Sequence, residues 1–117
     1  MTALNEVPVF DRASALLRVG GDLQLLREIG ALFVDESGPA LQELRQAVAA
    51  RDSAAIERKA HELKGSIANF GAGSAFQAAF ELEQRGRSGN LEHIDGLFNR
   101  FADSLGCLCA ELRALAA

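Results

Sequence analysis

The strongest constraint on the fold of this chain is an apolar repeat in its last quarter. Eight apolar residues recur there at alternating spacings of three and four: Leu91, Ile94, Phe98, Phe101, Leu105, Leu108, Leu112 and Leu115. An upstream segment has the same kind of spacing: Ile56, Ala60, Leu63, Ile67 and Phe70. Because an α-helix turns once in about 3.6 residues, each set forms one apolar stripe along a helix. Helices bury such stripes by packing around a common seam, so both segments predict a helical bundle.

The rest of the chain also has helical character. Proline occurs only at Pro8 and Pro39, and no segment alternates apolar and polar residues as a half-buried strand would. The ranges expected to form helices are about 11–19, 23–51, 53–70, 74–85 and 91–115. Pro39 lies within the second range, where its ring predicts a kink or two stacked segments. We therefore expect an all-α fold: an antiparallel four-helix bundle with a short additional N-terminal helix, in a single domain over 1–117 whose core spans about 10–115.

Capping residues and glycines mark the expected helix ends. Asp22 and Asn90 are the expected N-caps of the second and the last helix, and Gly71-Ala72-Gly73 is expected to end the third. Ser74 and Gln77, three residues apart, form a capping-box pattern that predicts the start of the fourth helix. The residues of the fourth helix expected in the core are Phe76, Ala79, Phe80 and Leu82.

The charge and composition of the chain exclude several classes of protein. Its 12 basic and 16 acidic residues give a formal net charge of -4, whereas a duplex-binding protein needs a concentrated basic face. No apolar run approaches the roughly 20 residues of a membrane span, and the N-terminus lacks the pattern of a signal peptide. Cys107 and Cys109 point in different directions on a helix and are expected to be reduced thiols. We expect a cytoplasmic protein with no nucleic-acid or membrane partner.

His61 lies outside the apolar stripe of its helix. At about 100° per residue, the five apolar positions of this helix fall within about 40° of one direction, and His61 lies about 140° away from it. Lys64, Gly65 and Ala68 follow three, four and seven residues later and share its face. Glycine inside a helix costs about 1 kcal/mol relative to alanine, and we interpret Gly65 as clearing space for a second molecule to reach the imidazole. The alternatives are a glycine that lets another helix approach closely and a solvated surface histidine.

The residues that share a helix face with His61 suit a histidine that acts as a nucleophile. Neutral imidazole is a good nucleophile near pH 7, and one ring nitrogen can take a phosphoryl group while the other stays protonated and hydrogen-bonded. The transferred group carries negative charge on three oxygens, which the ammonium of Lys64 would stabilise. Ser66 lies on the flank and could contribute a hydroxyl only if its rotation around the helix allows.

The spacing of the histidines excludes two kinds of metal site. His61-Glu62 lacks the second histidine, at position 65, that a zinc-protease motif requires, and the paired Glu-x-x-His motifs of a di-iron bundle are absent from the sequence. The other histidine, His93, is expected in the first turn of the last helix, exposed to solvent. We therefore expect no metal site.

The segment His61-x-Leu63-Lys64-Gly65-Ser66, followed by Phe70-Gly71-Ala72, resembles the signature of the histidine-containing phosphotransfer (HPt) domain of two-component phosphorelays. The resemblance covers roughly residues 10–105. Further similar features are Phe10-Asp11, Gly20-Gly21-Asp22, the interruption near Pro39, the turn from Ala49 to Asp52, and Leu82-Glu83 followed by Gly86. One departure is Ile67, where family members commonly carry a small residue, and we interpret it as a change in core packing.

The resemblance implies a phosphoryl carrier. His61 would accept a phosphoryl group from the phospho-aspartate of one receiver domain and pass it to the aspartate of another, Lys64 would stabilise the phosphoryl charge, and Gly65 would leave room for the partner. The residues expected to contribute to binding are Arg58, Ser66, Ala68 and Asn69. The expected partners are response-regulator receiver domains and a hybrid sensor histidine kinase, and the chain is expected to be a monomer. Magnesium would belong to the receiver, so no cofactor is expected here.

No nucleotide site is expected in this chain, because the sequence lacks a Gly-x-x-x-x-Gly-Lys loop and a kinase-like glycine-rich strand. It would therefore be no enzyme by itself. Two alternatives remain open at this point. The chain could be the phosphoacceptor module of a chemotaxis-type histidine kinase whose ATP-binding part lies on another chain. It could also be a bundle that docks on receivers without carrying phosphate.

Overall fold

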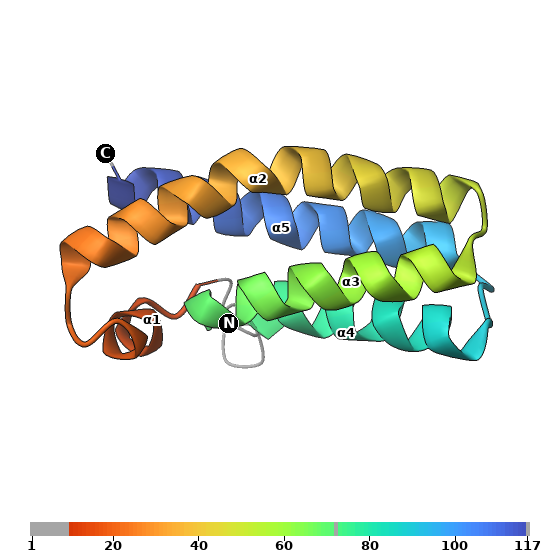
Figure 1. The fold of residues 1–117 in the computed structure, drawn as a ribbon, viewed down its shortest axis with the longest axis horizontal. Coiled ribbons are helices and arrows are strands. Elements are labelled where there is room, and N and C mark those ends of the chain that lie inside the picture. The colour runs from red at the N-terminus through yellow and green to blue at the C-terminus, as the bar shows by residue number, and fades with distance from the viewer. Residues whose placement is uncertain (1–9, 72, 117) are drawn as a thin grey trace, which may run out of the picture.

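The structure is a computed structural model that describes residues 10–71 and 73–116. Within these residues the regular structure is helical throughout. The helices are α1 (Arg12–Arg18), α2 (Leu23–Ala49), α3 (Ser53–Ile67), the short 3-10 helix η2 (Ala68–Phe70), α4 (Gly73–Ser88) and α5 (Ile94–Ala116). Figure 1 shows α2, α3, α4 and α5 as long antiparallel elements, with α1 at one end of the bundle. The expected all-α fold, a four-helix bundle with a short N-terminal helix, is confirmed.

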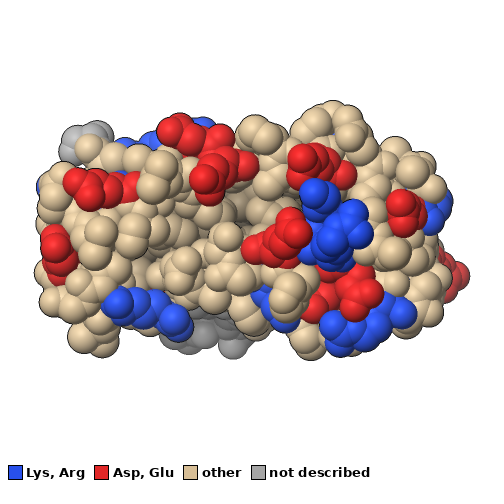
Figure 2. All heavy atoms as spheres, viewed as in Figure 1, with Lys and Arg blue, Asp and Glu red and all other residues tan. Residues whose placement is uncertain are grey.

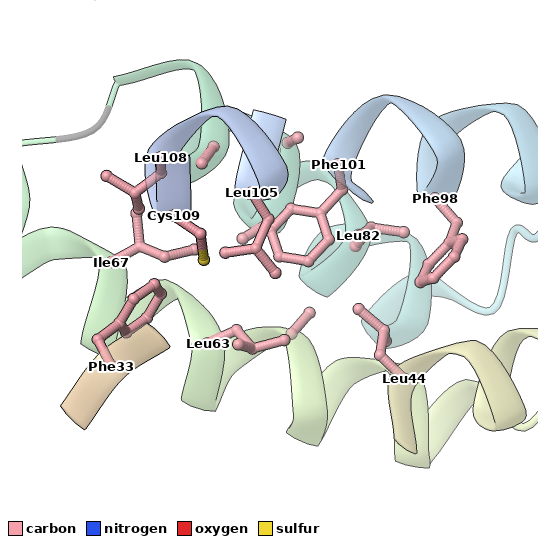
Figure 3. Packing of buried hydrophobic residues seen from close by; sticks show 14 of the residues in the cluster. Phe33, Leu44, Leu63, Ile67, Leu82, Phe98, Phe101, Leu105, Leu108 and Cys109 are labelled. Atoms are coloured by element: carbon pink, nitrogen blue, oxygen red, sulfur yellow. The ribbon is translucent and has the colours of Figure 1, made fainter. Parts of the chain in front are cut away.

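The core lies where the four long helices meet. Both α3 and α5 pack against α2 and α4, so the four helices form a ring around the core. The apolar stripe predicted for the third helix, called here the third-helix stripe, is buried, because each of its residues is at most 5% exposed. These residues are Ile56, Ala60, Leu63, Ile67 and Phe70. The apolar repeat within α5 is buried as well: Ile94, Phe98, Phe101, Leu105, Leu108, Leu112 and Leu115. Figure 3 shows Leu63, Leu82, Phe101 and Leu105 pointing into the same space between the helices. The apolar spacing therefore identified the interior of the bundle correctly.

Aspartates cap the first three helices. The side chains of Asp11, Asp22 and Asp52 each accept a hydrogen bond from the backbone N–H three residues later, at 3.0, 3.0 and 3.1 Å respectively. Each carboxylate satisfies an N–H group that has no partner within its helix. The expected cap at Asp22 is confirmed, and Asp52 is the cap that starts α3.

The end of the third-helix stripe is held by α1 and α2. The backbone N–H of Asp11 donates to the carbonyl of Phe70 at 3.2 Å. The Phe70 ring centroid lies 6.4 Å from that of Phe10 and 5.2 Å from that of Phe33. Gly71, with a φ of 58°, then turns the chain out of η2 in the left-handed region that favours glycine. The predicted helix end holds at Gly71, whereas Ala72 lies outside the described residues.

α2 continues through Pro39 as one helix, so of the two outcomes expected there, a kink or two stacked segments, the second is excluded. The proline has no N–H to donate to the carbonyl four residues back. The nearby Ser37 hydroxyl donates to the carbonyl of Val34 at 2.9 Å. Phe33 and Leu44, on either side of the proline, are buried in the same core. Packing against α3 and α5 therefore maintains the helix across the missing hydrogen bond.

α4 differs from expectation at its start and on its buried face. It begins one residue before Ser74, which lies inside the first turn instead of capping it. Ala79 and Leu82 are buried as expected, but Phe76 is half-buried and Phe80 is 45% exposed. The expected burial of Phe80 is wrong because α4 turns small residues toward its neighbours and leaves this ring at the edge of the α3–α4 interface.

α5 begins later than the apolar repeat suggested. Asn90 does not cap it, because the helix begins at Ile94. The Asn90 side chain instead accepts a hydrogen bond from the N–H of Glu92 at 3.2 Å and closes a turn. His93 has a φ of 60°, which breaks the helical backbone before Ile94, and it is exposed as predicted although it precedes the first turn. Leu91 is half-buried in the turn, so it continues the stripe without being helical.

None of the helices in the described part of the chain is both long and apolar enough to cross a membrane.

Candidate functional site

His61 lies on α3 with its side chain outside the bundle core, as the helical geometry predicted. The side chain is 66% exposed, and its Nδ1 lies 2.9 Å from Oε2 of Glu83 on α4. An ionised carboxylate only accepts hydrogen bonds, so in the neutral imidazole Nδ1 carries the proton and Nε2 has the lone pair. The Nε2 atom of a neutral imidazole held in this way is a nucleophile.

Glu83 is a site residue that was not expected from the sequence. Its side chain is only 3% exposed, although carboxylates are rarely buried. Oε1 lies 2.7 Å from Nζ of Lys64, and the guanidinium of Arg87 donates to Oε2 at 3.1 Å. The Lys64 ammonium, with a smaller contribution from His61, holds the pKa of Glu83 below its ordinary value against the opposing effect of burial. Glu83 is therefore an ionised carboxylate in contact with the side chains of His61, Lys64 and Arg87.

One signal in the sequence could have located Glu83. It shares a face of α4 with Ala79 and Gly86, four residues before it and three after it. Small residues around an acidic one indicate a face that packs closely on another helix, where a buried carboxylate needs cationic partners. Helical periodicity cannot say which helix packs there, so the sequence alone could not pair Glu83 with His61.

Lys64 lies one turn along α3 from His61 and reaches the same carboxylate. Its side chain is 20% exposed. The ammonium lies over two aromatic rings, 5.9 Å from the centroid of Phe76 and 5.2 Å from that of Phe80. The structure thus brings His61 and Lys64 together through Glu83. The contact of Lys64 with a phosphoryl group stays a prediction.

Gly65 leaves open space on the face of α3 that carries His61. A Cβ atom at this position would meet no atom of another element within 4 Å, so Gly65 does not serve close packing against another helix. Ala68 is half-buried and borders a hollow that Gly71 and Phe76 also line. The role of Gly65 in giving a partner access to His61 stays a prediction. The binding role of Ala68 stays a prediction.

Arg58 and Arg87 border a surface hollow beside His61. The hollow has a volume of about 320 Å³, and its other lining residues are Ala54, Glu57, His61, Glu62 and Glu83. Nε of Arg87 donates to Glu57 at 2.8 Å, so this guanidinium bridges Glu57 and Glu83. Figure 2 shows basic and acidic side chains gathered together over one half of the face that α3 crosses. The hollow therefore places two guanidinium groups and three carboxylates next to the imidazole.

Ser66 and Asn69 are not brought to this cluster. Ser66 borders a groove between α2 and α3 that is also lined by Phe33, Glu36 and Lys59. Asn69 is exposed on η2. The binding roles expected for both residues stay predictions.

No set of three or more His, Cys, Asp or Glu suited to a metal ion occurs within residues 10–71 and 73–116. Cys107 is exposed, and Cys109 is buried with its Sγ 3.3 Å from the hydroxyl of Ser37. Both cysteines are free thiols, as the sequence predicted.

Comparison with known proteins gives three findings. Residues 28–117 match the Hpt domain family. The chain is 34% identical over 88 residues to the sensor protein TorS of Escherichia coli (strain K12), a match that covers 71% of this chain and 10% of TorS. The chain thus spans about a tenth of the length of that relative. The fold is similar to the crystal structure of histidine-containing phosphotransfer protein B from Pseudomonas aeruginosa PAO1, with a TM-score of 0.84, 23% identity, and coverage of 93% of this chain and 95% of that one.

Proposed function

From the premise that the chain belongs to the Hpt domain family, we propose that His61 is its phosphoacceptor. This family carries out histidine phosphotransfer in two-component phosphorelays. In this proposal His61 takes a phosphoryl group from the phospho-aspartate of a receiver domain and passes it to the aspartate of another receiver. Response-regulator receivers and a hybrid sensor histidine kinase are the partners. The observation that carries the proposal is the 2.9 Å hydrogen bond between Nδ1 of His61 and the buried carboxylate of Glu83.

Transfer to His61 exchanges one bond to phosphorus for another. The lone pair of Nε2 forms the N–P bond while the P–O bond to the donor aspartate breaks, and that aspartate leaves as a carboxylate. Nδ1 keeps its proton throughout, because Glu83 accepts that hydrogen bond before and after transfer. The ring gains positive charge as the N–P bond forms, and the Glu83 carboxylate stabilises this charge. Transfer to the next receiver reverses these steps.

Three cationic side chains support the phosphoryl group in this proposal. Lys64 and Arg87 already contact Glu83, and Arg58 lines the same hollow as His61. The phosphoryl group carries negative charge on its three equatorial oxygens in the transition state, so cations within reach lower the barrier. A carboxylate held next to a phosphoryl group would repel it unless such cations were present. The contacts of Lys64 and Arg87 with Glu83 meet both requirements.

An apolar surface beside the site fits a receiver domain. We define it by Gly65, Ala68, Phe76 and Phe80, and call it the docking surface. Phe80 is 45% exposed and Gly65 has open space around it. A large exposed aromatic ring next to a reactive residue is typical of an interaction site. In this proposal a receiver covers the docking surface and places its aspartate opposite Nε2 of His61.

The test is transfer of radiolabelled phosphate from a phosphorylated receiver to the full chain. We expect a label that is acid-labile and alkali-stable, as phosphohistidine is, and that is lost in His61→Gln. The matched control is His93→Gln, because His93 is the other histidine and is also exposed. Labelling that persists in His61→Gln, or that is lost only in His93→Gln, would refute the assignment of His61.

The match to one-tenth of a sensor protein favours a second candidate. In this candidate the chain is the phosphoacceptor module of a chemotaxis-type histidine kinase whose ATP-binding part lies on another chain. Incubation with candidate kinases and ATP, without any receiver, separates the two. Labelling of His61 under these conditions supports the kinase module, and labelling only from a phosphorylated receiver supports the relay.

A further inference from the structure

The backbones of α3 and α4 come into contact at Gly86. A Cβ atom at this position would lie 2.5 Å from the backbone nitrogen of Glu57, 2.7 Å from the carbonyl oxygen of Ser53 and 2.9 Å from Cα of Glu57. All three are backbone atoms of α3, which cannot rotate away as the end of a side chain can. Only glycine therefore permits this distance between the two helices.

The contact lies one helical turn from the site on both helices. On α4, Glu83 precedes Gly86 by three residues and Arg87 follows it directly. On α3, Glu57 precedes His61 by four residues. Two of the links between the helices flank the contact: Glu83 to His61 at 2.9 Å, and Arg87 to Glu57 at 2.8 Å. The separation of the helices at Gly86 therefore sets how far the side chains of Glu83 and Arg87 must extend to contact α3.

We propose that Gly86 is a positioning residue for phosphotransfer, an inference that rests on the proposed function of His61. By allowing the backbones to touch, Gly86 brings the Glu83 carboxylate within hydrogen-bond distance of Nδ1 of His61. Glu83 is 3% exposed and packed between the helices, so it has little freedom to follow His61 if α3 and α4 separate. Gly86 acts through Glu83 and does not touch the phosphoryl group.

The size of the effect follows from the contact distances. Alanine at position 86 needs its Cβ about 3.4 Å from the nitrogen of Glu57, against the 2.5 Å available, so the helices must separate by roughly 1 Å nearby. A hydrogen bond of 2.9 Å lengthened by that amount is no longer a hydrogen bond. Misplacement of a catalytic contact by about 1 Å can reduce a rate by about 100-fold.

The experiment compares Gly86→Ala with two matched glycine-to-alanine variants of the full chain. Gly96→Ala changes a helical glycine of α5 with open space around it. Gly30→Ala disturbs packing between α2 and α5, where the new Cβ would lie 3.3 Å from the Leu112 side chain. This second control separates a local effect on the site from a general loss of stability. Thermal unfolding of each variant gives the loss of stability.

The first readout is the protonation of the His61 ring nitrogens, followed by long-range ¹H–¹⁵N NMR. The second is the initial rate of labelling by phosphoramidate, whose P–N bond breaks as the Nε2–P bond forms and ammonia leaves. In Gly86→Ala we expect loss of the Nδ1–H form and a rate reduced by about 10- to 100-fold. In Gly96→Ala and Gly30→Ala we expect the wild-type tautomer and a rate within about twofold of wild type.

A wild-type tautomer and rate in Gly86→Ala would overturn the inference, and so would an equal loss of rate in Gly30→Ala at equal stability. If Gly86→Ala does not fold, Glu83→Asp replaces it, because it withdraws the carboxylate by one methylene without changing the helix contact. A wild-type rate in Glu83→Asp would then overturn the inference. A wild-type protein that takes no label refutes the proposed function instead, while the tautomer readout still tests the position of Glu83.

Discussion

Replacing Glu83 with glutamine keeps the size of the side chain and removes its charge. The native carboxylate accepts a hydrogen bond from Nδ1 of His61 at 2.9 Å and faces the ammonium of Lys64 at 2.7 Å. An amide has one accepting oxygen and one donating nitrogen. With its oxygen toward His61, the amide nitrogen meets the ammonium, donor against donor. In the opposite orientation the amide donates to Nδ1, and the ring proton moves to Nε2, which then has no lone pair for attack.

The expected magnitude follows from the interaction that is lost. A hydrogen bond to a charged group contributes about 1.5 to 3 kcal/mol, which corresponds to a labelling rate lower by about 10- to 100-fold. Removing one partner of a fully buried ion pair costs about 3 to 5 kcal/mol of stability. Lys64 is 20% exposed and Arg87 is 56% exposed, so both cations can turn toward solvent. We therefore expect the smaller loss of about 1 to 3 kcal/mol in the free energy of unfolding.

The difference in stability should depend on pH. The pKa of Glu83 is held below its ordinary value of 4.5, first by Lys64, so the folded protein binds this proton less readily than the unfolded chain. The stabilising contribution of Glu83 is fully present above about pH 4.5 and is lost as the pH falls through the lower, folded-state pKa. The gap in the free energy of unfolding between wild type and Glu83→Gln should therefore be largest above pH 4.5 and shrink below it.

The assays are the initial rate of phosphoramidate labelling and urea unfolding at several pH values. The matched control is Glu81→Gln, a glutamate of the same helix that is 52% exposed and lies 3.8 Å from Arg100. We expect this control to stay within about 0.5 kcal/mol of wild type, as exposed substitutions usually do. A Glu83→Gln variant with a wild-type labelling rate and an unchanged Nδ1–H tautomer would refute the role given to the buried carboxylate.

Three further predictions concern the packing of α3, the stability of the helix at Gly65 and access to His61. Leu63→Ala and Ile67→Ala should each lower the free energy of unfolding by about 2 to 5 kcal/mol, because both side chains are at most 5% exposed. The measurement is urea unfolding. A loss below about 0.5 kcal/mol in both variants would contradict the assignment of these residues to the buried stripe. Gly65→Ala should raise the free energy of unfolding by up to about 1 kcal/mol, because no neighbour lies within 4 Å of its Cβ position. Gly65→Phe should slow transfer from a phosphorylated receiver while leaving phosphoramidate labelling near the wild-type rate. Equal slowing with both donors would show that Gly65 does not serve partner access.

The parts of the fold that the sequence predicted well depend on local spacing. The third-helix stripe from Ile56 to Phe70 and the α5 repeat were identified because neighbours three and four residues apart share a helix face whatever the helix packs against. The outward position of His61 follows from the same geometry. Asp22 was recognisable as a cap because its bond reaches only three residues along the chain.

The errors occurred where tertiary packing overrides a local signal. Pro39 would break an isolated helix, but burial on both sides keeps α2 continuous. Phe80 was expected in the core because it is apolar, yet it lies at the edge beside Lys64. His93 and Leu91 kept the helical spacing in a segment that is a turn. At Pro39 and Phe80 the deciding contacts are made with another part of the chain, whereas the turn before α5 is closed locally by the Asn90 side chain.

By itself the sequence determined that the chain is a helical bundle and that one face of its third helix carries His61, Lys64 and Gly65. Only the tertiary structure decided that Glu83 is buried against that face and that Gly86 brings α4 close enough for the hydrogen bond to form. The physical reason is that helical periodicity fixes directions within one helix, whereas the pairing and separation of two helices depend on contacts between residues distant in the chain. The outward position of His61 could be predicted from its own helix, α3, but Glu83, the group that orients the imidazole, lies on the next helix, α4.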